Sequence, residues 1–204
     1  MSAMWSERHR PKLLSECVLE HLDDYSRNFL QEAVTASQLI NVLLHGPPGT
    51  GKSTIARILC DKDRFSVNSF NGSLFEKSDV DKLQGMVATC SVYLNQRCIL
   101  IDEQALRAVI EGASDCAWIC TANELRKVIP PLLSRIILID CSYATLQRRE
   151  AHFAGIMRRC REILAAESVK ITEAELRHVV ELNYPDVRQT INALQFRSGN
   201  LIAA

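Results

Sequence analysis

Short apolar segments rich in branched residues alternate with polar or helical stretches over the first 140 residues. Five of them are expected to be strands: Leu39–Leu44, Phe65–Asn68, Cys98–Asp102, Ala117–Thr121 and Ile136–Asp140. Continuous apolar runs of this length, without polar alternation, are typical of strands buried on both faces. Because helical or loop stretches separate them, the pattern predicts an α/β fold with a parallel five-stranded sheet.

The pattern changes after Cys141. From Thr145 onward apolar residues recur at helical spacing, namely Leu146, Phe153, Ile156, Met157, Cys160, Ile163 and Leu164. Thr172 and Glu175 form a capping box that opens a second helix through Leu182, and Pro185 lies just inside the start of a third, which ends near Gly199. We therefore expect an α/β domain over residues 1–141 and a small helical domain over residues 142–204.

Composition adds limits to this outline. With 204 residues, 47% of them hydrophobic, the chain can bury one substantial core and a small second one. No apolar run is long enough to cross a bilayer, and the polar N-terminus does not resemble a secretory signal, so we expect a cytoplasmic protein that does not contact membranes. The formal net charge of +0 means that any nucleic-acid contact must use a local patch. One candidate is a group of arginines, for which a solvated helix face is the favoured interpretation: Arg148, Arg149, Arg158, Arg159 and Arg161.

Eight cysteines are scattered through apolar segments. They form no C-x-x-C pair and have no matching histidine cluster, so a zinc site is disfavoured. Most are expected to be buried thiols that behave as small hydrophobic residues.

The segment from His45 to Ser53 (HGPPGTGKS) contains the pattern G-x-x-x-x-G-K-[ST] between a predicted strand and a predicted helix over Ser53–Cys60. Glycines let such a loop turn its N–H groups toward phosphates, Lys52 reaches the outer phosphates, and the Ser53 hydroxyl can bind Mg²⁺. The pattern predicts an ATP site that includes Pro48, Gly49, Thr50, Gly51, Lys52, Ser53 and Thr54.

Polar residues follow two later strands. Asp102 and Glu103 end the segment RCILIDE, where Asp102 is expected to hold Mg²⁺, directly or through water, and Glu103 to polarise the attacking water. Asn123 follows the strand WICTA. Because the carboxyl ends of strands converge on the ligand crevice of such sheets, Asn123 can reach the γ-phosphate or the water. A lone Asn could equally be a turn former.

The order of GPPGTGKS, ILIDE, TAN, PLLSR and PDVRQTIN, preceded by RHRPKLLSECVL, resembles the AAA+ clamp-loader ATPases, whose members include replication factor C small subunits and the T-even bacteriophage ATPase subunit. The resemblance covers nearly the whole chain. It implies an AAA+ P-loop fold with a helical lid. It also implies that Arg10, Pro11, Cys17 and Val18 wrap adenine. Finally, it implies roles near the γ-phosphate for Asn123 (sensor 1), Arg188 (sensor 2) and Arg135, which would enter the neighbouring subunit's site.

By this resemblance the chain would hydrolyse ATP within a ring-shaped, hetero-oligomeric assembly of clamp-loader subunits that loads a sliding clamp onto primer–template DNA. It departs from the family in three places. Ile136 replaces a Cys, Glu103 runs into Gln104 without roughly ten intervening residues, and the chain stops at Ala204, where the collar domain would begin. Two other functions stay open: a helicase-loader or Holliday-junction-type motor, and a non-catalytic ATP-binding adaptor in a larger ring.

Overall fold

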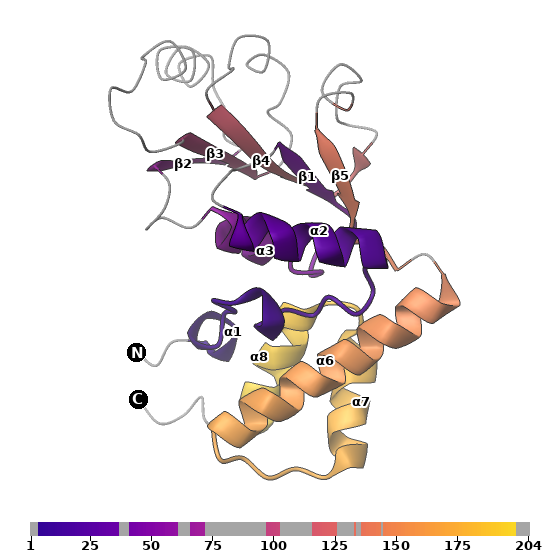
Figure 1. Cartoon of the computed structure of the whole chain (residues 1–204). Helices are drawn as coiled ribbons and strands as arrows, with labels where there is room; N and C mark the ends of the chain where they lie inside the picture. Colours follow the sequence, from indigo (N-terminus) through magenta and orange to yellow (C-terminus); the bar gives the residue numbers. More distant parts are fainter. Residues whose placement is uncertain are drawn as a thin grey trace.

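The computed structural model of the chain describes residues 4–36, 41–60, 66–71, 97–102, 116–125, 133, 136–143 and 145–198. One parallel sheet has the strand order β2-β3-β4-β1-β5. Its strands are β1 (Val42–His45), β2 (Ser66–Asn71), β3 (Arg97–Asp102), β4 (Cys116–Ala122) and β5 (Ile137–Asp140). Helices α2 (Asp24–Thr35) and α3 (Lys52–Leu59) lie along one face of this sheet (Figure 1).

Each strand lies within a few residues of a segment expected from the apolar pattern. The central strand β1 pairs with β4 on one side and β5 on the other, so that His45 is in register with both Ala122 and Asp140. Asp102 at the end of β3 is in register with Thr121 on β4. Because all pairs are parallel, the loops that follow β1, β3 and β4 leave the sheet at the same edge.

The core under the sheet is formed by apolar side chains of β1, β4, α2 and α3. Leu44, Ile119 and Ile139 are buried from three adjacent strands, and they pack with Leu30 of α2 and Ile55 of α3. The helix expected at Ser53–Cys60 begins one residue earlier, at Lys52, because Gly51 provides its N-cap. The helix therefore starts directly at the end of the glycine-rich loop.

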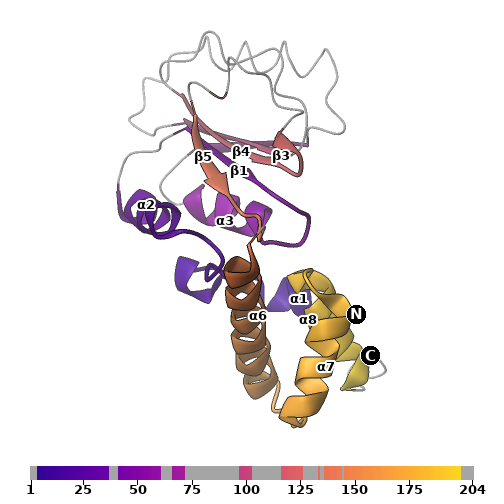
Figure 2. The ribbon, with the colours of Figure 1, turned by 90° about the vertical axis from the view of Figure 1, so that its right-hand side faces the viewer.

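Three further helices form the lid: α6 (Leu146–Ala166), α7 (Glu173–Asn183) and α8 (Val187–Arg197) (Figure 2). The predicted capping box is confirmed, since Thr172 accepts from the Glu175 amide and the Glu175 carboxylate accepts from the Thr172 amide. The prediction that Pro185 lies inside the third helix is wrong. Asp186 is the N-cap and accepts from the Gln189 amide, so Pro185 precedes the helix.

Residues 4–23, here called the N-terminal strap, connect the two cores. The strap contains α1 (Trp5–Arg8) and the short 3₁₀ helix η1 (Leu14–Glu16), neither of which the apolar pattern predicts. Trp5 is fully buried among lid residues, and its N–H donates to Gln195 Oε1 (2.8 Å). Leu14 instead packs in the core under the sheet. The first residues of the chain therefore pack with the lid, although the expected division assigns residues 1–141 to the α/β domain.

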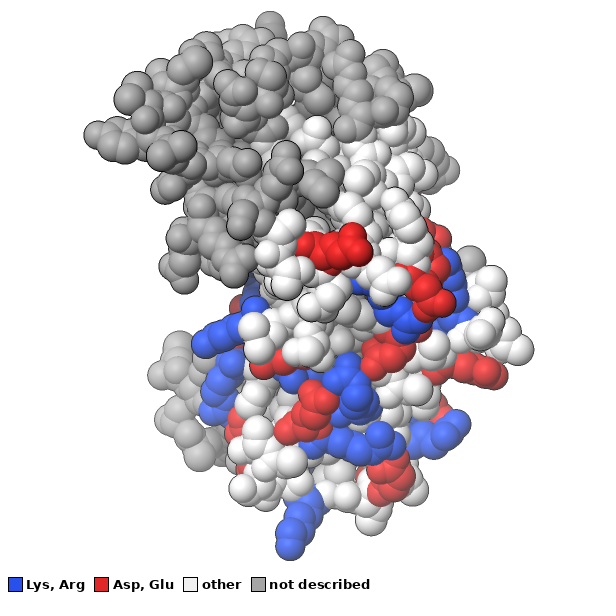
Figure 3. Space-filling model, in the orientation of Figure 1, with Lys and Arg blue, Asp and Glu red and all other residues white. Residues whose placement is uncertain are grey.

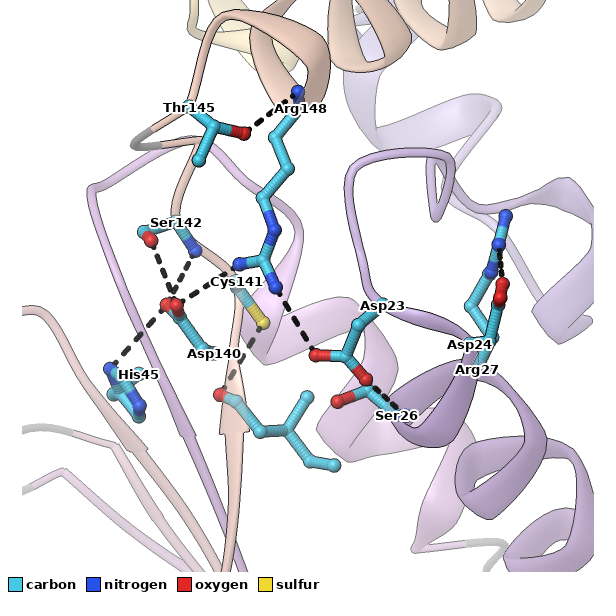
Figure 4. Close-up of polar contacts among 11 residues, drawn as sticks. Asp23, Asp24, Ser26, Arg27, His45, Asp140, Cys141, Ser142, Thr145 and Arg148 are labelled. Carbon is cyan, nitrogen blue, oxygen red and sulfur yellow. Dashed lines mark hydrogen bonds and ion pairs between the residues drawn. The ribbon is translucent and has the colours of Figure 1, made fainter.

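A polar cluster fastens the lid where it leaves the sheet (Figure 4). Arg148 near the start of α6 donates to Asp140 at the end of β5 (3.1 Å) and to Asp23, the N-cap of α2 (3.3 Å). Burial acts to raise the pKa of Asp140, but hydrogen bonds from Ser142, together with the nearby His45 and Arg148, lower it overall. Sheet, lid and strap are thus joined through one guanidinium.

The surface of the lid carries charges of both signs. Figure 3 shows Lys and Arg side chains interspersed with Asp and Glu over this face. Arg158 pairs with Glu20 and Glu162, and Arg161 pairs with Glu173. Arg158 and Arg161 therefore fit the interpretation of a solvated helix face better than that of a nucleic-acid patch, whereas Arg148 and Arg159 are more enclosed. Within the described residues, no helix has the length and apolar character needed to cross a membrane.

Four aromatic rings pack together at the junction of strap, linker and lid. His21 and His152 are fully buried, with ring centroids 4.6 Å apart, and Tyr143 stacks on His152 while Tyr184 packs against it edge-on. The ring nitrogens of both histidines have no hydrogen-bond partner among the described residues. Burial lowers the pKa of His21 to about 4 and that of His152 to about 3.

These shifts predict an acid-sensitive fold. As the pH falls below the ordinary histidine pKa of 6.5, the unfolded chain binds protons that folded His21 and His152 do not bind. The contribution of the two histidines to the free energy of unfolding should be complete above pH 6.5. As the pH falls from 6.5 toward 4, the free energy of unfolding should decrease by about 1.4 kcal/mol per pH unit for each of the two histidines. Urea unfolding between pH 7 and pH 5 measures this slope. His152→Phe should remove about half of it, whereas His178→Phe, at an exposed position on α7, should leave it unchanged. A full slope in His152→Phe would contradict the assignment.

Candidate functional site

A cavity of about 440 Å³ lies where the strap, the glycine-rich loop and the lid meet. This volume is typical of small-molecule sites, which span roughly 300–1,000 Å³. Every residue predicted to bind nucleotide lines this cavity: Arg10, Pro11, Cys17, Val18, Pro48, Gly49, Thr50, Gly51, Lys52, Ser53, Thr54, Asn123 and Arg188. The fold therefore brings together residues separated by more than half of the chain.

The loop after β1 forms one end of the cavity. The loop has positive φ values of 140°, 83° and 84° at Gly46, Gly49 and Gly51, and residues other than glycine rarely adopt such values. The loop leads into the first turn of α3, where the amides of Thr54 and Ile55 donate to the carbonyl of the N-cap Gly51 (both 2.9 Å), and the positive end of the helix dipole faces the loop. Lys52 is buried, and its Nζ donates to the carbonyls of Gly46 (2.8 Å) and Pro47 (2.7 Å). Its ammonium is thus held within the loop that an anion would enter.

The strap forms the other end. Arg10 and Pro11 line the cavity before η1, and Cys17 and Val18 line it afterwards. The Glu16 carboxylate shapes this turn by accepting from the amides of Lys12 (2.8 Å) and Leu13 (3.4 Å), and the bond from Lys12 is the largest cause of its lowered pKa. Burial raises the pKa of Cys17 to about 12, so this thiol contributes neutral packing surface at neutral pH.

The start of α8 closes the cavity over the loop. Val187 N–H donates to the Gly49 carbonyl (3.4 Å), and Arg188 follows it in the lining. A Cβ atom placed on Gly49 would lie 2.6 Å from Asp186 Cγ. Lid and loop are therefore in direct contact, and only a glycine fits at this point of contact.

The catalytic edge is only partly described. Asn123 lines the cavity directly after β4. Asp102 ends β3, two strands from the loop and at the same edge of the sheet. Glu103 and Arg135 lie outside the described residues. No group of three or more His, Cys, Asp and Glu side chains that could hold a metal ion occurs within the described part of the chain. The cysteines with described side chains (Cys17, Cys60, Cys120, Cys141 and Cys160) are buried free thiols, as expected.

Several residues of the cavity are absent from the sequence-based prediction: Ser6, His9, Glu16, Ile55, Arg159, Asp186, Val187 and Ile191. Asp186 has a detectable signal, because an Asp directly before an apolar helical pattern is a typical N-cap. Arg159 has none, since an arginine on an amphipathic helix is normally solvated.

Two family profiles match the chain. Residues 42–105 match the ATPase family associated with various cellular activities (AAA), and residues 151–202 match the AAA+ ATPase lid domain of the sliding-clamp-loader large subunit.

Several curated proteins are similar to this chain over more than nine-tenths of its length. The sliding-clamp-loader large subunit of Escherichia phage RB69 is 29% identical over 97% of this chain, and that of Enterobacteria phage T4 is 29% identical over 92%. Replication factor C small subunit 2 of Pyrobaculum aerophilum is 30% identical over 94%. The chain spans 66%, 62% and 62% of the lengths of these relatives, respectively.

Among solved structures, the Thermotoga maritima RuvB Holliday junction branch migration motor superposes with a TM-score of 0.68. It is 19% identical over 92% of this chain and 64% of its own. At this identity the match shows the fold alone, an AAA+ P-loop fold with a helical lid.

The contact between lid and loop predicts different effects for two glycine substitutions. Gly49→Ala and Gly51→Ala share a similar backbone cost, because φ is 83° and 84°, but no described atom lies within 4 Å of a Cβ at Gly51. The Gly49→Ala protein should therefore be less stable than the Gly51→Ala protein by about 1–3 kcal/mol, the usual cost of overpacking. Urea unfolding without nucleotide measures the difference. Equal stabilities would show that α8 does not rest on the loop.

Proposed function

We propose that this chain, which belongs to the clamp-loader group of AAA+ ATPases, binds and hydrolyses ATP to help load a sliding clamp onto primer–template DNA. One observation carries the proposal: the strap, the glycine-rich loop and the start of α8 surround one cavity that is lined by the residues predicted from the sequence to bind nucleotide. We assign residues 1–141 to the nucleotide-binding domain and residues 142–204 to the lid.

The two ends of the cavity suit the two ends of a nucleotide. The loop and the α3 N-terminus offer backbone N–H groups and Lys52 to the phosphates. The strap offers the apolar surfaces of Pro11, Cys17 and Val18 to the base. Asn123 and Arg188 are assigned to the γ-phosphate end, next to the loop.

Oxygen ligands are available for Mg²⁺, which prefers them: the Ser53 hydroxyl and the Asp102 carboxylate are assigned to this ion. Bound Mg²⁺ would neutralise charge on the phosphates. Glu103, the residue after β3, is assigned as the base that orients the attacking water, and Lys52 stabilises the negative charge that grows on the phosphate oxygens.

Assembly is also part of the proposal. The relatives are named as a sliding-clamp-loader subunit and a replication factor C subunit, which suggests that this chain joins other subunits, a clamp and DNA, in the cytoplasm. Arg135 is assigned to the neighbouring subunit's ATP. A Holliday-junction-type motor is less supported, because its likeness rests on the fold alone.

Lys52→Ala should lower the affinity for Mg²⁺-ATP more than tenfold, about 1.4 kcal/mol or more, because it removes the cation nearest the phosphates. Calorimetry measures the affinity. Arg57→Ala, on the exposed face of the same helix, is the matched control and should bind ATP as the wild type does. Unchanged affinity in a folded Lys52→Ala protein would refute the phosphate-binding assignment.

Arg135→Ala should bind ATP normally but lose about a thousandfold or more in hydrolysis, because it lacks the guanidinium that stabilises the phosphoryl group of the next subunit. Glu103→Gln should also bind ATP and turn over slowly, because an amide cannot act as a base. Mixing the two proteins should restore part of the activity. The Arg135→Ala subunit keeps an intact ATP site, and a neighbouring Glu103→Gln subunit can supply Arg135 to it.

Steady-state phosphate release, with and without clamp and primer–template DNA, is the measurement for the mixture. An inactive mixture of proteins that demonstrably co-assemble would rule out a shared site. Activity without any response to a clamp would favour a different AAA+ motor, and ATP binding without hydrolysis in the wild-type assembly would favour the adaptor.

A further inference from the structure

Two neighbouring arginines of α6 hold the backbone of the N-terminal strap. Arg159 Nη2 donates to the His9 carbonyl (2.8 Å), and Arg158 Nη2 donates to the Cys17 carbonyl (3.0 Å). These carbonyls lie immediately before Arg10–Pro11 and before Val18, the residues that line the cavity at its strap end. The lid therefore grips the strap at both places where it forms the cavity wall.

Arg159 is the more enclosed of the two. Its side chain is 11% exposed, compared with 37% for Arg158 and 52% for Arg161 on the same helix. Its Nη1 donates to Glu162 Oε2 (2.9 Å), which leaves Nη2 for the strap. Arg159 also lines a second cavity, as His9, Arg10 and Glu16 of the strap do.

The position of Arg159 is not explained by stability alone. Its Nε atom is buried and has no acceptor among the described residues. A buried guanidinium with an unmet donor is an unfavourable way to pack a helix, and an apolar residue would fill the same space without that cost. The contact that an apolar residue could not make is the hydrogen bond that holds the His9 carbonyl in place.

The strap also follows the lid through Trp5, whose N–H is bonded to Gln195 and whose ring is packed in the lid core. The loop that receives phosphates belongs instead to the sheet and α3. The strap end of the cavity is shared between the two packed units, because Cys17 packs in the core under the sheet and Val18 packs in the lid core, and Arg159 bonds this end to the lid.

We propose that Arg159 is a positioning residue for the nucleotide base. By holding the His9 carbonyl, it sets the path of Arg10–Pro11 and so shapes the surface on which the base rests. The inference rests on the proposed function, because it requires that a nucleotide occupies this cavity with its phosphates at the loop. It assigns to Arg159 the part of the affinity that depends on the base and none of the part that depends on the phosphates.

The test compares two probes by calorimetry: Mg²⁺-ATP, which needs both ends of the cavity, and Mg²⁺-tripolyphosphate, which needs only the loop. Arg159→Met keeps an unbranched apolar stem as far as the position of Nε but cannot donate to the His9 carbonyl. It should weaken Mg²⁺-ATP about tenfold or more and change the affinity for tripolyphosphate less than about twofold. Arg161→Met, whose native partner is Glu173, is the matched control and should change neither affinity.

Arg159→Lys guards against a folding defect in Arg159→Met. Lysine keeps the charge and can reach one acceptor but cannot serve His9 and Glu162 together, so the loss for ATP should be intermediate, again without a loss for tripolyphosphate. Equal losses for both probes in a folded variant, or no loss for either, would overturn the positioning role. Failure of the wild-type protein to bind Mg²⁺-ATP at all would instead overturn the proposed function, and the inference with it.

Discussion

The cavity depends on one short stretch of chain that is buried in two cores at once. Trp5 is packed in the lid, Leu14 is packed under the sheet, and the residues between them have to cross the gap. Burial of a Trp and a Leu supplies several kcal/mol of hydrophobic stabilisation at the ends of this crossing. Between them, the short helix α1 pairs backbone groups as far as the Arg10 amide. Beyond it, the Glu16 carboxylate accepts from the amides of Lys12 and Leu13, and Arg159 donates to the His9 carbonyl. The strap therefore forms one wall of the cavity without containing a strand or a long helix.

The opposite wall has a different origin. Parallel pairing of β1 with β4 and β5 requires that the loop after β1 leaves the sheet beside Asn123, and three positive φ values let that loop turn before α3 begins. The close approach of Asp186 to Gly49 then fixes how near the lid can come. The positive φ values act locally and the other two constraints act between distant parts of the chain, and together they set the depth of one cavity between the sheet and the lid.

The phosphate loop and the strands could be predicted from sequence because their determinants are local: glycine spacing, apolar runs and a basic residue at the start of a helix. The strap could be located only by resemblance. Trp5 has no periodic apolar neighbours that would indicate its partner, since that partner lies in α8, and the contact of Arg159 with His9 joins residues far apart in the chain. Pro185 was misplaced because proline suits both the first turn of a helix and the residue before its cap, and the Asp186 side chain decides between them. Glu103 and Arg135 lie outside the described residues, so their roles stay predictions.

The joint between sheet and lid suggests why the cavity would respond to what fills it. At the linker the units are tied by Arg148, which bonds both Asp140 and Asp23, and by the packed rings around His152. At the start of α8 they touch through the 3.4 Å bond between Val187 N–H and the Gly49 carbonyl. A ligand held at one end by the loop and at the other by the strap would add contacts to both units across the cavity. Binding energy spent in this way would bias the angle between them, because only one angle lets both ends make their contacts.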